Sequence, residues 1–244
     1  RAKGQIGQKG EKKAVRTIWA EHVQFEKTGT KFEIHSVKFN FKPIGRFYFE
    51  NVLAAITTCR ALGLSLEQIR DAVEKLEPIP GRLEVVDEGQ LFSVIVDYAP
   101  EPASLSAIYE VLKLIGYYRL IHVLGSTGGG RDISRRAVLG QMSATNADIM
   151  IVTNEDPYDD DPMEIINNIA DAAVKAGKQD NVNLFRILDR QEAIDKAISV
   201  AQQGDLVLLT GKGNEPVMVV AGGKKIPWDD RQAARQALHN LNKI

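Results

Sequence analysis

The chain has 244 residues, of which 44% are hydrophobic and 26% are charged, and its formal net charge at pH 7 is −1. These values are typical of a soluble globular protein with one large or two ordinary domains, and they offer no electrostatic basis for binding nucleic acid or an acidic membrane. No apolar run reaches the length of a membrane span, and the single cysteine, Cys59, excludes an internal disulfide and a multi-thiolate metal site. We therefore expect a protein of a reducing compartment, the cytoplasm, without membrane insertion.

The first 41 residues are predicted to form a loop followed by two strands. Residues 1–10 combine glycines with basic side chains and show no periodicity, which is typical of a loop. Apolar and polar residues alternate over 17–23 and 32–41, and this pattern predicts two strands joined by a turn. We interpret His22 and His35, which lie in these segments, as residues of an ordinary sheet surface.

Two helices are predicted next. Apolar residues recur at helical spacing over 49–62, where Asn51 lies in the first turn. Taken alone, Asn51 is typical of a helix start, although its amide could also contact a ligand. Ser65 and Gln68 have the spacing of a capping box, and they predict a second helix that ends near Leu76.

From Arg82 onward, strand and helix signals alternate along the chain. Strands are predicted at 83–86, 92–96, 118–124, 149–152, 184–188 and 206–209, and helices at 103–115, 134–145, 162–176, 190–202 and from Asp230 onward. Such alternation predicts an α/β fold, with a mostly parallel, Rossmann-like sheet and helices on both of its faces. Because prolines and a glycine over 78–81 separate this part from the first, we predict two domains, residues 1–80 and 81–244.

Polar residues follow the predicted buried strands, and open α/β sheets bind ligands at the carboxyl ends of their strands. Asp97 and Tyr98 come directly after the strand predicted at 92–96, where they either contact a ligand or cap a turn. A glycine-rich turn follows the next strand, and after it come Arg131, Arg135 and Arg136. Backbone N–H groups and guanidinium groups suit a carboxylate or a phosphate, but a flexible turn with a solvated basic face would have the same composition.

Two further strand ends carry charged turns. Residues 155–161 contain five acids, which could bind a metal ion, hold an ammonium group or favour the start of a helix at Asp161 and Pro162. Residues 211–215, Gly-Lys-Gly-Asn-Glu, follow the last predicted strand and are not a P-loop, because no Ser or Thr follows the lysine. Since parallel strands end at one edge of a sheet, we predict that these turns form one site for a small zwitterion or a nucleotide.

Taken in order, these motifs resemble the C-terminal half of the Mur ligases, and the resemblance runs from about Lys42 to the end of the chain. The matching segments are Asn51 with 53–55, Pro80-Gly81-Arg82-Leu83-Glu84, Asp97-Tyr98-Ala99, Gly130-Arg131-Asp132, Asp156-Pro157, Gly211-Lys212-Gly213 with Glu215, and Asp229-Asp230-Arg231. Within the family, they are most similar to the branch that adds the third residue of the peptidoglycan stem peptide. The resemblance implies that 1–80 is the α/β tail of the family's central ATPase domain and that 81–244 is its amino-acid-binding domain.

The resemblance implies an ATP-dependent amide ligation. ATP would phosphorylate the terminal carboxylate of a UDP-linked muramoyl dipeptide, and the amine of a free amino acid would attack the acyl phosphate. The residues implied to contact ATP are Asn51, Arg82, Asp97 and Tyr98, and those implied to line the amino-acid pocket are Arg131, Asp156, Tyr158, Gly211 and Glu215. Arg131 would hold the α-carboxylate by a forked pair of hydrogen bonds. Mg²⁺ would be bound mainly by residues upstream of this sequence. Within the 244 residues we assign neither a metal ligand nor a catalytic residue.

Three departures from the family's pattern carry further expectations. Pro100 and Asn214 each replace a family histidine, and Tyr158 stands where diaminopimelate-adding members have an arginine that pairs with the distal carboxylate of diaminopimelate. Because Tyr158 has no positive charge and the neighbouring acids would repel a carboxylate, we predict a cationic amino acid such as L-lysine. The family's UDP-binding domain and P-loop are not in the sequence, so we expect a fragment of the enzyme that does not turn over ATP alone.

Other functions fit parts of the pattern. Other Mur-like ligases, of the folylpolyglutamate, cyanophycin or D-glutamate-handling types, share the general reaction. A non-catalytic module that binds an amino acid or a nucleotide would need the same strand-end turns. A dinucleotide oxidoreductase is suggested only by the α/β alternation, because no Gly-x-Gly-x-x-Gly follows the first strand.

Overall fold

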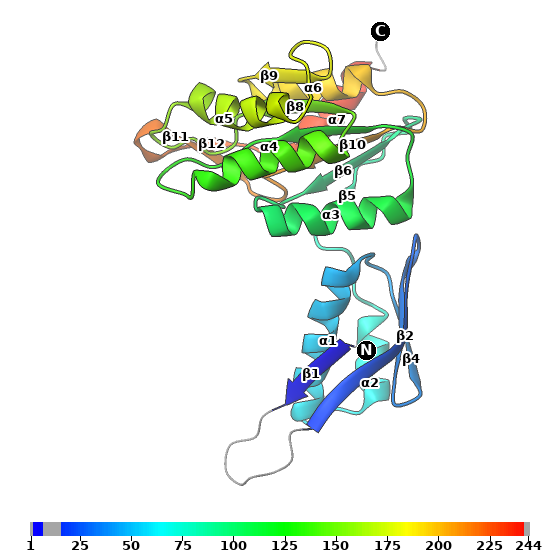
Figure 1. Ribbon diagram of the computed structural model, residues 1–244. Coiled ribbons are helices and arrows are strands. Elements are labelled where there is room, and N and C mark those ends of the chain that lie inside the picture. The colour runs from blue at the N-terminus through cyan, green and yellow to red at the C-terminus, as the bar shows by residue number, and fades with distance from the viewer. Residues whose placement is uncertain (1, 7–15, 242–244) are drawn as a thin grey trace. The chain divides into compact units, whose positions relative to one another are not determined.

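The structure is a computed structural model that describes residues 2–6 and 16–241, drawn as a ribbon in Figure 1. By its internal contacts the chain divides into two compact units. The first unit comprises residues 1–78 with 110–115, and the second comprises 79–109 with 116–244. The division after Pro78 falls at the start of the proline- and glycine-containing stretch that interrupts the helical pattern.

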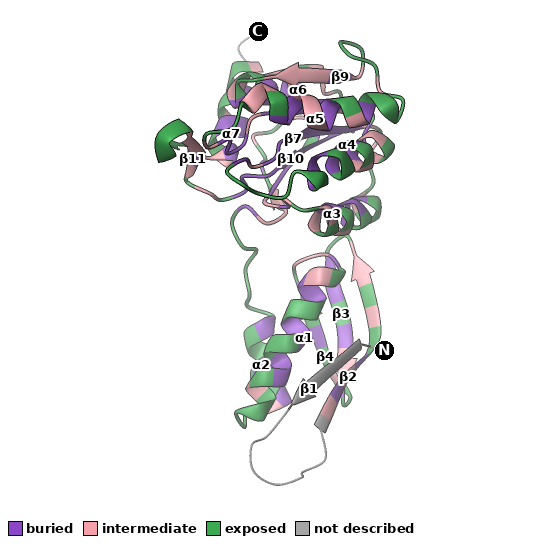
Figure 2. Cartoon of the chain, turned by 60° about the vertical axis from the view of Figure 1, so that its left-hand side comes forward, coloured by how far each residue is buried: buried purple, intermediate pink, exposed green. Residues whose placement is uncertain are grey.

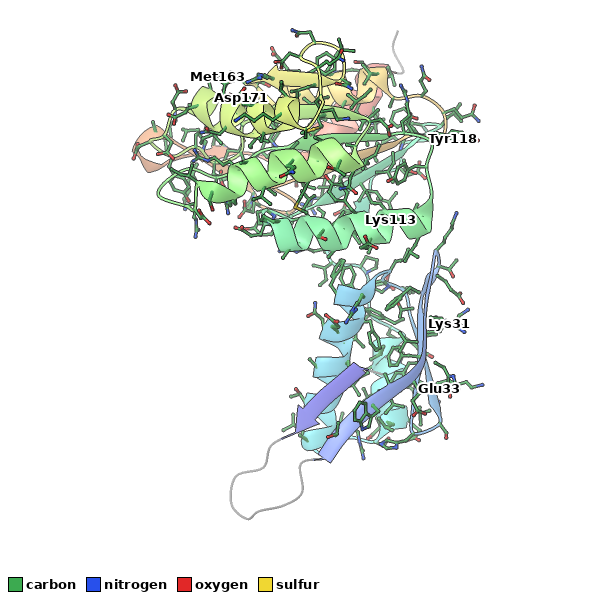
Figure 3. The ribbon with its side chains drawn as sticks, in the orientation of Figure 1. Lys31, Glu33, Lys113, Tyr118, Met163 and Asp171 are labelled. Atoms are coloured by element: carbon green, nitrogen blue, oxygen red, sulfur yellow. The ribbon has the colours of Figure 1, made fainter. Side chains whose placement is uncertain are left out.

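Within residues 1–78, the first unit consists of an antiparallel sheet and two helices. Its strands, in the order in which they pair, are β1 (Ala2–Ile6), β2 (Arg16–Glu26), β3 (Gly29–Ile34) and β4 (Val37–Phe41), and its helices are α1 (Arg46–Ala61) and α2 (Leu66–Val73). Side chains alternate along β3: Phe32 is buried and stacks on Phe39 at 4.9 Å between ring centroids, whereas Lys31 and Glu33 point away from the core (Figure 3). The capping box of α2 is confirmed, because Gln68 N–H donates to the Ser65 hydroxyl and Ser65 N–H donates to the Gln68 side chain.

Two predictions for this unit are wrong. The predicted loop at 1–10 contains β1, which is held by pairing with β2 rather than by any alternation of its own, and residues 7–10 lie outside the described residues. The predicted strand at 32–41 is two strands joined at His35 and Ser36, whose φ angles of 46° and 66° reverse the chain without a glycine. His35 is therefore a turn residue, while His22 lies exposed on β2 at an irregularity in its pairing with β3.

The second unit is built on a six-stranded sheet. In spatial order the strands are β5 (Glu84–Val85), β6 (Ser93–Asp97), β10 (Leu206–Thr210), β7 (Leu120–Leu124), β8 (Ile149–Thr153) and β9 (Leu184–Ile187). All neighbouring pairs are parallel except β5 with β6, so the predicted mostly parallel α/β sheet is confirmed. Its strands are short apolar runs because both faces of the sheet are covered.

Helices cover the two faces of this sheet. Figure 1 shows α3 (Pro102–Ile115), α4 (Ser134–Asn146) and α5 (Pro162–Lys175) on one face, with α6 (Arg190–Val200) and α7 (Asp230–Leu241) on the other. Figure 2 shows the central strands and the inward faces of the helices as buried. One core joins alternate strand residues, such as Val207 and Leu209, to alanines of α6 and α7.

A hairpin that is not among the elements predicted from the sequence follows the sheet. The strands β11 (Val217–Val220) and β12 (Lys224–Pro227) pair only with each other, and they are joined by a short 3₁₀ turn at Ala221–Gly223. The run at 217–220 is apolar, but it is only four residues long and its partner strand is basic and exposed. In the described part of the chain, no helix is both long enough and apolar enough to cross a bilayer.

Candidate functional site

The turns after four parallel strands lie at one edge of the sheet and are tied to one another. Asp97 at the end of β6 pairs in register with Thr210 at the end of β10, so the following turns start side by side. Gly211 N–H donates to the Tyr98 carbonyl at 3.0 Å, and Gly128 N–H donates to the Asp156 carbonyl at 2.8 Å. These bonds join the turn after β6 to the turn after β10, and the turn after β7 to the turn after β8.

Asp97, Tyr98 and Arg82 form a cluster at the end of β6. Asp97 is the last residue of the strand, not the first beyond it, and its two carboxylate oxygens accept backbone N–H groups from Leu83 at 2.7 Å and Ala99 at 2.8 Å. Burial raises the pKa of Asp97, and these two N–H groups oppose the rise. The Arg82 guanidinium lies 4.3 Å from the centre of the Tyr98 ring, which is a cation–π contact.

Lys212 connects two of the predicted pocket residues. Its ammonium donates to both oxygens of Asp156, at 2.9 and 2.8 Å, and to Glu215 at 2.7 Å. Asp156 also accepts the N–H of Val219 on β11 at 2.7 Å, so its carboxylate is already paired by the protein. Glu215 keeps 36% of its side chain exposed and is the member of this cluster that a ligand can reach.

Glu155 is a buried acid that the sequence analysis did not single out from its acidic turn. The Thr127 hydroxyl donates to one of its oxygens at 2.7 Å, and the other oxygen is buried without a hydrogen-bond partner. Burial raises the pKa of Glu155 against the hydrogen bond from Thr127 and the charge of Arg190. Gly211 has a φ of 111°, and a Cβ built there would lie 2.3 Å from the free Glu155 oxygen, so only glycine fits.

The glycine-rich turn packs closely against Tyr158. A Cβ on Gly128 would lie 2.2 Å from the Pro157 carbonyl oxygen, and one on Gly129 would lie 2.7 Å from the Tyr158 ring. Tyr158 has a φ of 53° and donates its N–H to the Val219 carbonyl, which joins this turn to the β11–β12 hairpin. Arg131 follows the turn with an exposed side chain that has no ion-pair partner among the described residues.

The predicted residues therefore fall into two places. Asn51 is exposed on α1 of the first unit. All the others lie in the second unit, at or beside the ends of the parallel strands. Of the three interpretations of the acidic turn, the helix start is confirmed for Asp161, whose carboxylate accepts the N–H of Met163 at 2.8 Å. Within the described ranges no three His, Cys, Asp or Glu side chains are grouped as metal ligands.

A buried polar network supports this edge from behind. The Nε2 atom of His122 on β7 lies 2.9 Å from the Thr210 hydroxyl, and its Nδ1 atom lies 2.9 Å from Tyr109 and 2.8 Å from Ser143. Thr210 immediately precedes Gly211, so the network fixes the end of β10 where the turn begins. His122 lies on a strand that the sequence predicts, but its partners come from α3, α4 and β10 and could not be identified from the sequence.

Replacing His122 with asparagine (H122N) is expected to flatten the dependence of stability on pH between about pH 6.5 and about pH 3. Burial, with a smaller effect of the Arg190 charge, lowers the pKa of His122 to about 3. Below about pH 6.5 the unfolded histidine binds a proton that the folded one does not, so unfolding becomes easier by about 1.4 kcal/mol for each unit of falling pH. Urea titrations at several pH values measure this slope.

The control for this slope is H35N, which changes a histidine exposed on a turn and should leave the pH dependence as it is in the unmodified chain. Equal slopes in H122N and the unmodified protein would contradict the assignment of a neutral, buried His122.

Comparison with known proteins places these motifs in one family. The model of the Mur ligase glutamate ligase domain matches residues 81–213. The UDP-N-acetylmuramoyl-L-alanyl-D-glutamate–2,6-diaminopimelate ligase of Geobacillus kaustophilus is 39% identical over 226 residues, which are 91% of this chain and 45% of the relative. The UDP-N-acetylmuramyl-tripeptide synthetase of Borreliella burgdorferi is 37% identical over 224 residues, which are 89% of this chain and 43% of the relative.

A solved structure agrees with these sequence matches. A diaminopimelate ligase of the same description superposes with a TM-score of 0.61 at 28% identity, covering 92% of this chain and 46% of the other. A pseudomurein peptide ligase type C from Methanothermus fervidus superposes with a TM-score of 0.64 at 20% identity, a likeness of fold. The chain thus spans less than half the length of the curated relatives it matches.

Proposed function

The chain belongs to the Mur ligase family, and we propose that it forms the amino-acid-binding part of an ATP-dependent ligase that adds the third residue of the peptidoglycan stem peptide. The observation that carries this proposal is the joining of four strand-end turns at one edge, with Glu215 and Arg131 both open to a ligand. An acid and a guanidinium at one edge suit a zwitterion. The names of the relatives, which are a diaminopimelate ligase and a tripeptide synthetase, support the same reaction.

In the proposed reaction, ATP phosphorylates the terminal carboxylate of a UDP-linked muramoyl dipeptide, the amine of the amino acid attacks the acyl phosphate, and phosphate leaves. Arg82, Asp97 and Tyr98 would hold the nucleotide, with the remaining lone pairs of Asp97 on the ribose hydroxyls. Mg²⁺ would neutralise the phosphate groups. Asp156 and Glu215 do not fit as its ligands, because both are paired with Lys212.

We propose L-lysine, or a similar cationic amino acid, as the amino acid that is added. Arg131 would hold its α-carboxylate, and Glu215 would receive one of its ammonium groups. Tyr158 packs on Gly129 and offers no positive charge to a second carboxylate. The exposed acid Asp159 beside it would repel that carboxylate. Diaminopimelate is the second candidate, because the Geobacillus kaustophilus relative is named for it.

Replacing Tyr158 with arginine (Y158R) is expected to reverse the preference between the two amino acids. An arginine would pair with the distal carboxylate of diaminopimelate, and a charge-assisted pair changes relative affinity by about tenfold to about a hundredfold. Calorimetric titration of the 244-residue chain with L-lysine and with meso-diaminopimelate measures both affinities. We expect the unmodified chain to favour lysine and Y158R to favour diaminopimelate.

The control is Y158F, which keeps the ring on Gly129 and should keep the preference for lysine. Tighter binding of diaminopimelate than of lysine by the unmodified chain would overturn the lysine assignment and leave the diaminopimelate alternative. We propose that the 244-residue chain does not release phosphate from ATP alone, so ligation itself is assayed in the full-length ligase.

A further inference from the structure

The first turn of α4 carries two buried arginines at the positive end of the helix. Arg135 is 7% exposed and Arg136 is 3% exposed, and both lie within the first turn of a helix that spans Ser134–Asn146. No acidic residue lies in that turn, and the N-cap residue Ile133 provides no side-chain cap. Cations are unfavourable at a helix N-terminus, and burial makes their charge still more costly, so the arrangement requires anions.

The two arginines are only partly paired. Arg135 donates from Nε to the Ser126 hydroxyl at 3.2 Å and from Nη1 to Glu101, while its Nη2 atom is buried without a hydrogen-bond partner. Arg136 donates from Nη2 to Asp160 at 3.3 Å, and its Nε atom is likewise buried and unpaired. A buried N–H group without an acceptor is costly in free energy, so both guanidinium groups have capacity for a further oxygen atom.

The acid that pairs with Arg135 is held at the surface rather than in the core. The side chain of Glu101 is 52% exposed, whereas that of Arg135 is 7% exposed. The backbone of Glu101 is anchored separately, by hydrogen bonds with the Ser104 hydroxyl at the start of α3. A carboxylate that reaches a buried arginine from solvent can be replaced there by another oxyanion without disturbing the core.

This position belongs to the same edge as the proposed site. Glu101 lies in the turn after β6, Ser126 lies in the turn after β7, and Asp160 lies in the turn after β8. Arg131, the exposed arginine assigned above to the α-carboxylate, precedes α4, whereas Arg135 lies in the first turn of that helix. The edge therefore presents two distinct guanidinium groups. That of Arg131 is exposed, and that of Arg135 is buried and paired with the surface acid Glu101.

We propose that Arg135 and Ser126 form an oxyanion subsite, in which Glu101 is an internal counter-ion that the ligand displaces. The inference rests on the proposed function, since that reaction supplies two oxyanions, a phosphoryl group and the carboxylate of the amino acid. The forked guanidinium recognises either of them. Arg136 remains paired with Asp160 and adds positive potential at the same helix end.

The test replaces Glu101 with glutamine (E101Q), which keeps the size of the side chain and removes the competing charge. Sodium phosphate is titrated against sodium chloride of equal ionic strength, and L-lysine is titrated against L-lysine amide, which lacks the carboxylate. One of these ligands is expected to bind about tenfold more tightly to E101Q than to the unmodified chain. In R135Q the binding of that ligand should be lost. R135K keeps the charge without the forked geometry, so its affinity should lie between those of the unmodified chain and R135Q.

The two titrations identify the source of the oxyanion. Tighter phosphate binding in E101Q indicates a phosphoryl group, and tighter lysine binding without a gain for lysine amide indicates the amino acid's carboxylate. The matched control is D171N, which alters a surface acid of α5 that pairs with Arg186 at 2.7 Å and should change neither affinity; Figure 3 shows Asp171 on this helix.

Unchanged affinity for both ligands in a folded E101Q would overturn the proposal and leave the Glu101–Arg135 pair with a structural role only. Circular dichroism checks the fold of each variant, and E101A takes the place of E101Q in the same titrations where E101Q does not fold. Absence of ATP-dependent ligation by the full-length enzyme, together with Arg135-dependent phosphate binding, would remove the proposed function and keep the subsite. Ligation by the full-length enzyme, with ligand affinities unchanged in the Glu101 and Arg135 variants, would keep the proposed function and remove the subsite.

Discussion

Replacing Asp230 with alanine (D230A) is expected to lower the free energy of unfolding of the second unit by about 3–5 kcal/mol. Asp230 and Arg190 form an ion pair in which both side chains are 0% exposed. The two oxygens of Asp230 accept from Arg190 at 2.8 and 2.7 Å, and one also accepts from the indole N–H of Trp228 at 2.8 Å. Truncation would leave a buried guanidinium without a counter-charge, which costs far more than the intact pair contributes.

The effect should extend to the ends of two strands. Arg190 also donates to the carbonyl of Asn154 at 3.1 Å and to the carbonyl of Thr210 at 2.9 Å. These two residues lie at the starts of the acidic turn and of the turn that contains Gly211. The ion pair thus joins the N-termini of α6 and α7 to the strand ends that carry the candidate site, and its loss should loosen these turns together.

Urea unfolding followed by circular dichroism and by tryptophan fluorescence measures the change, because Trp228 contacts Asp230 directly. The control is D171A, which removes an exposed partner of Arg186 and should cost about 0–1 kcal/mol. The double variant R190M/D230A, which removes both charges, should be more stable than D230A alone. A D230A protein as stable as D171A would contradict the role assigned to the buried pair.

The strand and helix alternation beyond Arg82 could be predicted because each element has a local signal. A parallel strand covered on both faces is a short apolar run, as in Leu120–Leu124, where every residue is buried. Because such strands end together, the candidate residues could also be assigned to one edge. The elements missed were those held by partners rather than by their own pattern, namely β1 and the β11–β12 hairpin.

The pairing of charges at the site could not be predicted, because it depends on contacts between distant parts of the chain. Lys212 and Asp156 are 56 residues apart, and nothing in the acidic turn indicates which of its acids a lysine would neutralise. Glu155 and Asp156 are neighbours in sequence, yet one is buried against Thr127 and Gly211 while the other joins Lys212 to β11. The packing of the turns against one another decides which partner each acid meets.

Replacing Lys212 with methionine (K212M) is expected to lower the free energy of unfolding by about 3 kcal/mol. The lysine is 1% exposed and is the positive charge held by Asp156 and Glu215. Methionine would fill the space of the aliphatic chain but would leave the Asp156 carboxylate buried without its counter-ion. Glu215 is partly exposed and can turn to water, so the cost arises mainly from Asp156.

Because Asp156 also accepts the N–H of Val219, the same change should reach the β11–β12 hairpin. Hydrogen exchange at the Val219 amide is expected to be faster in K212M. Without the lysine, the Asp156 carboxylate turns toward solvent and no longer accepts that amide's hydrogen bond. The variant K212M/D156N removes both charges and keeps an oxygen atom for Val219, so it should recover part of the lost stability and the slow exchange. The control K178M removes a lysine that donates to the carbonyls of Ala147 and Asp148, away from this site, and should leave Val219 protected. If K212M/D156N were no more stable than K212M, the cost would come from lost packing around the lysine, and the ion pair would not be what holds the turn at residues 211–215 to the acidic turn.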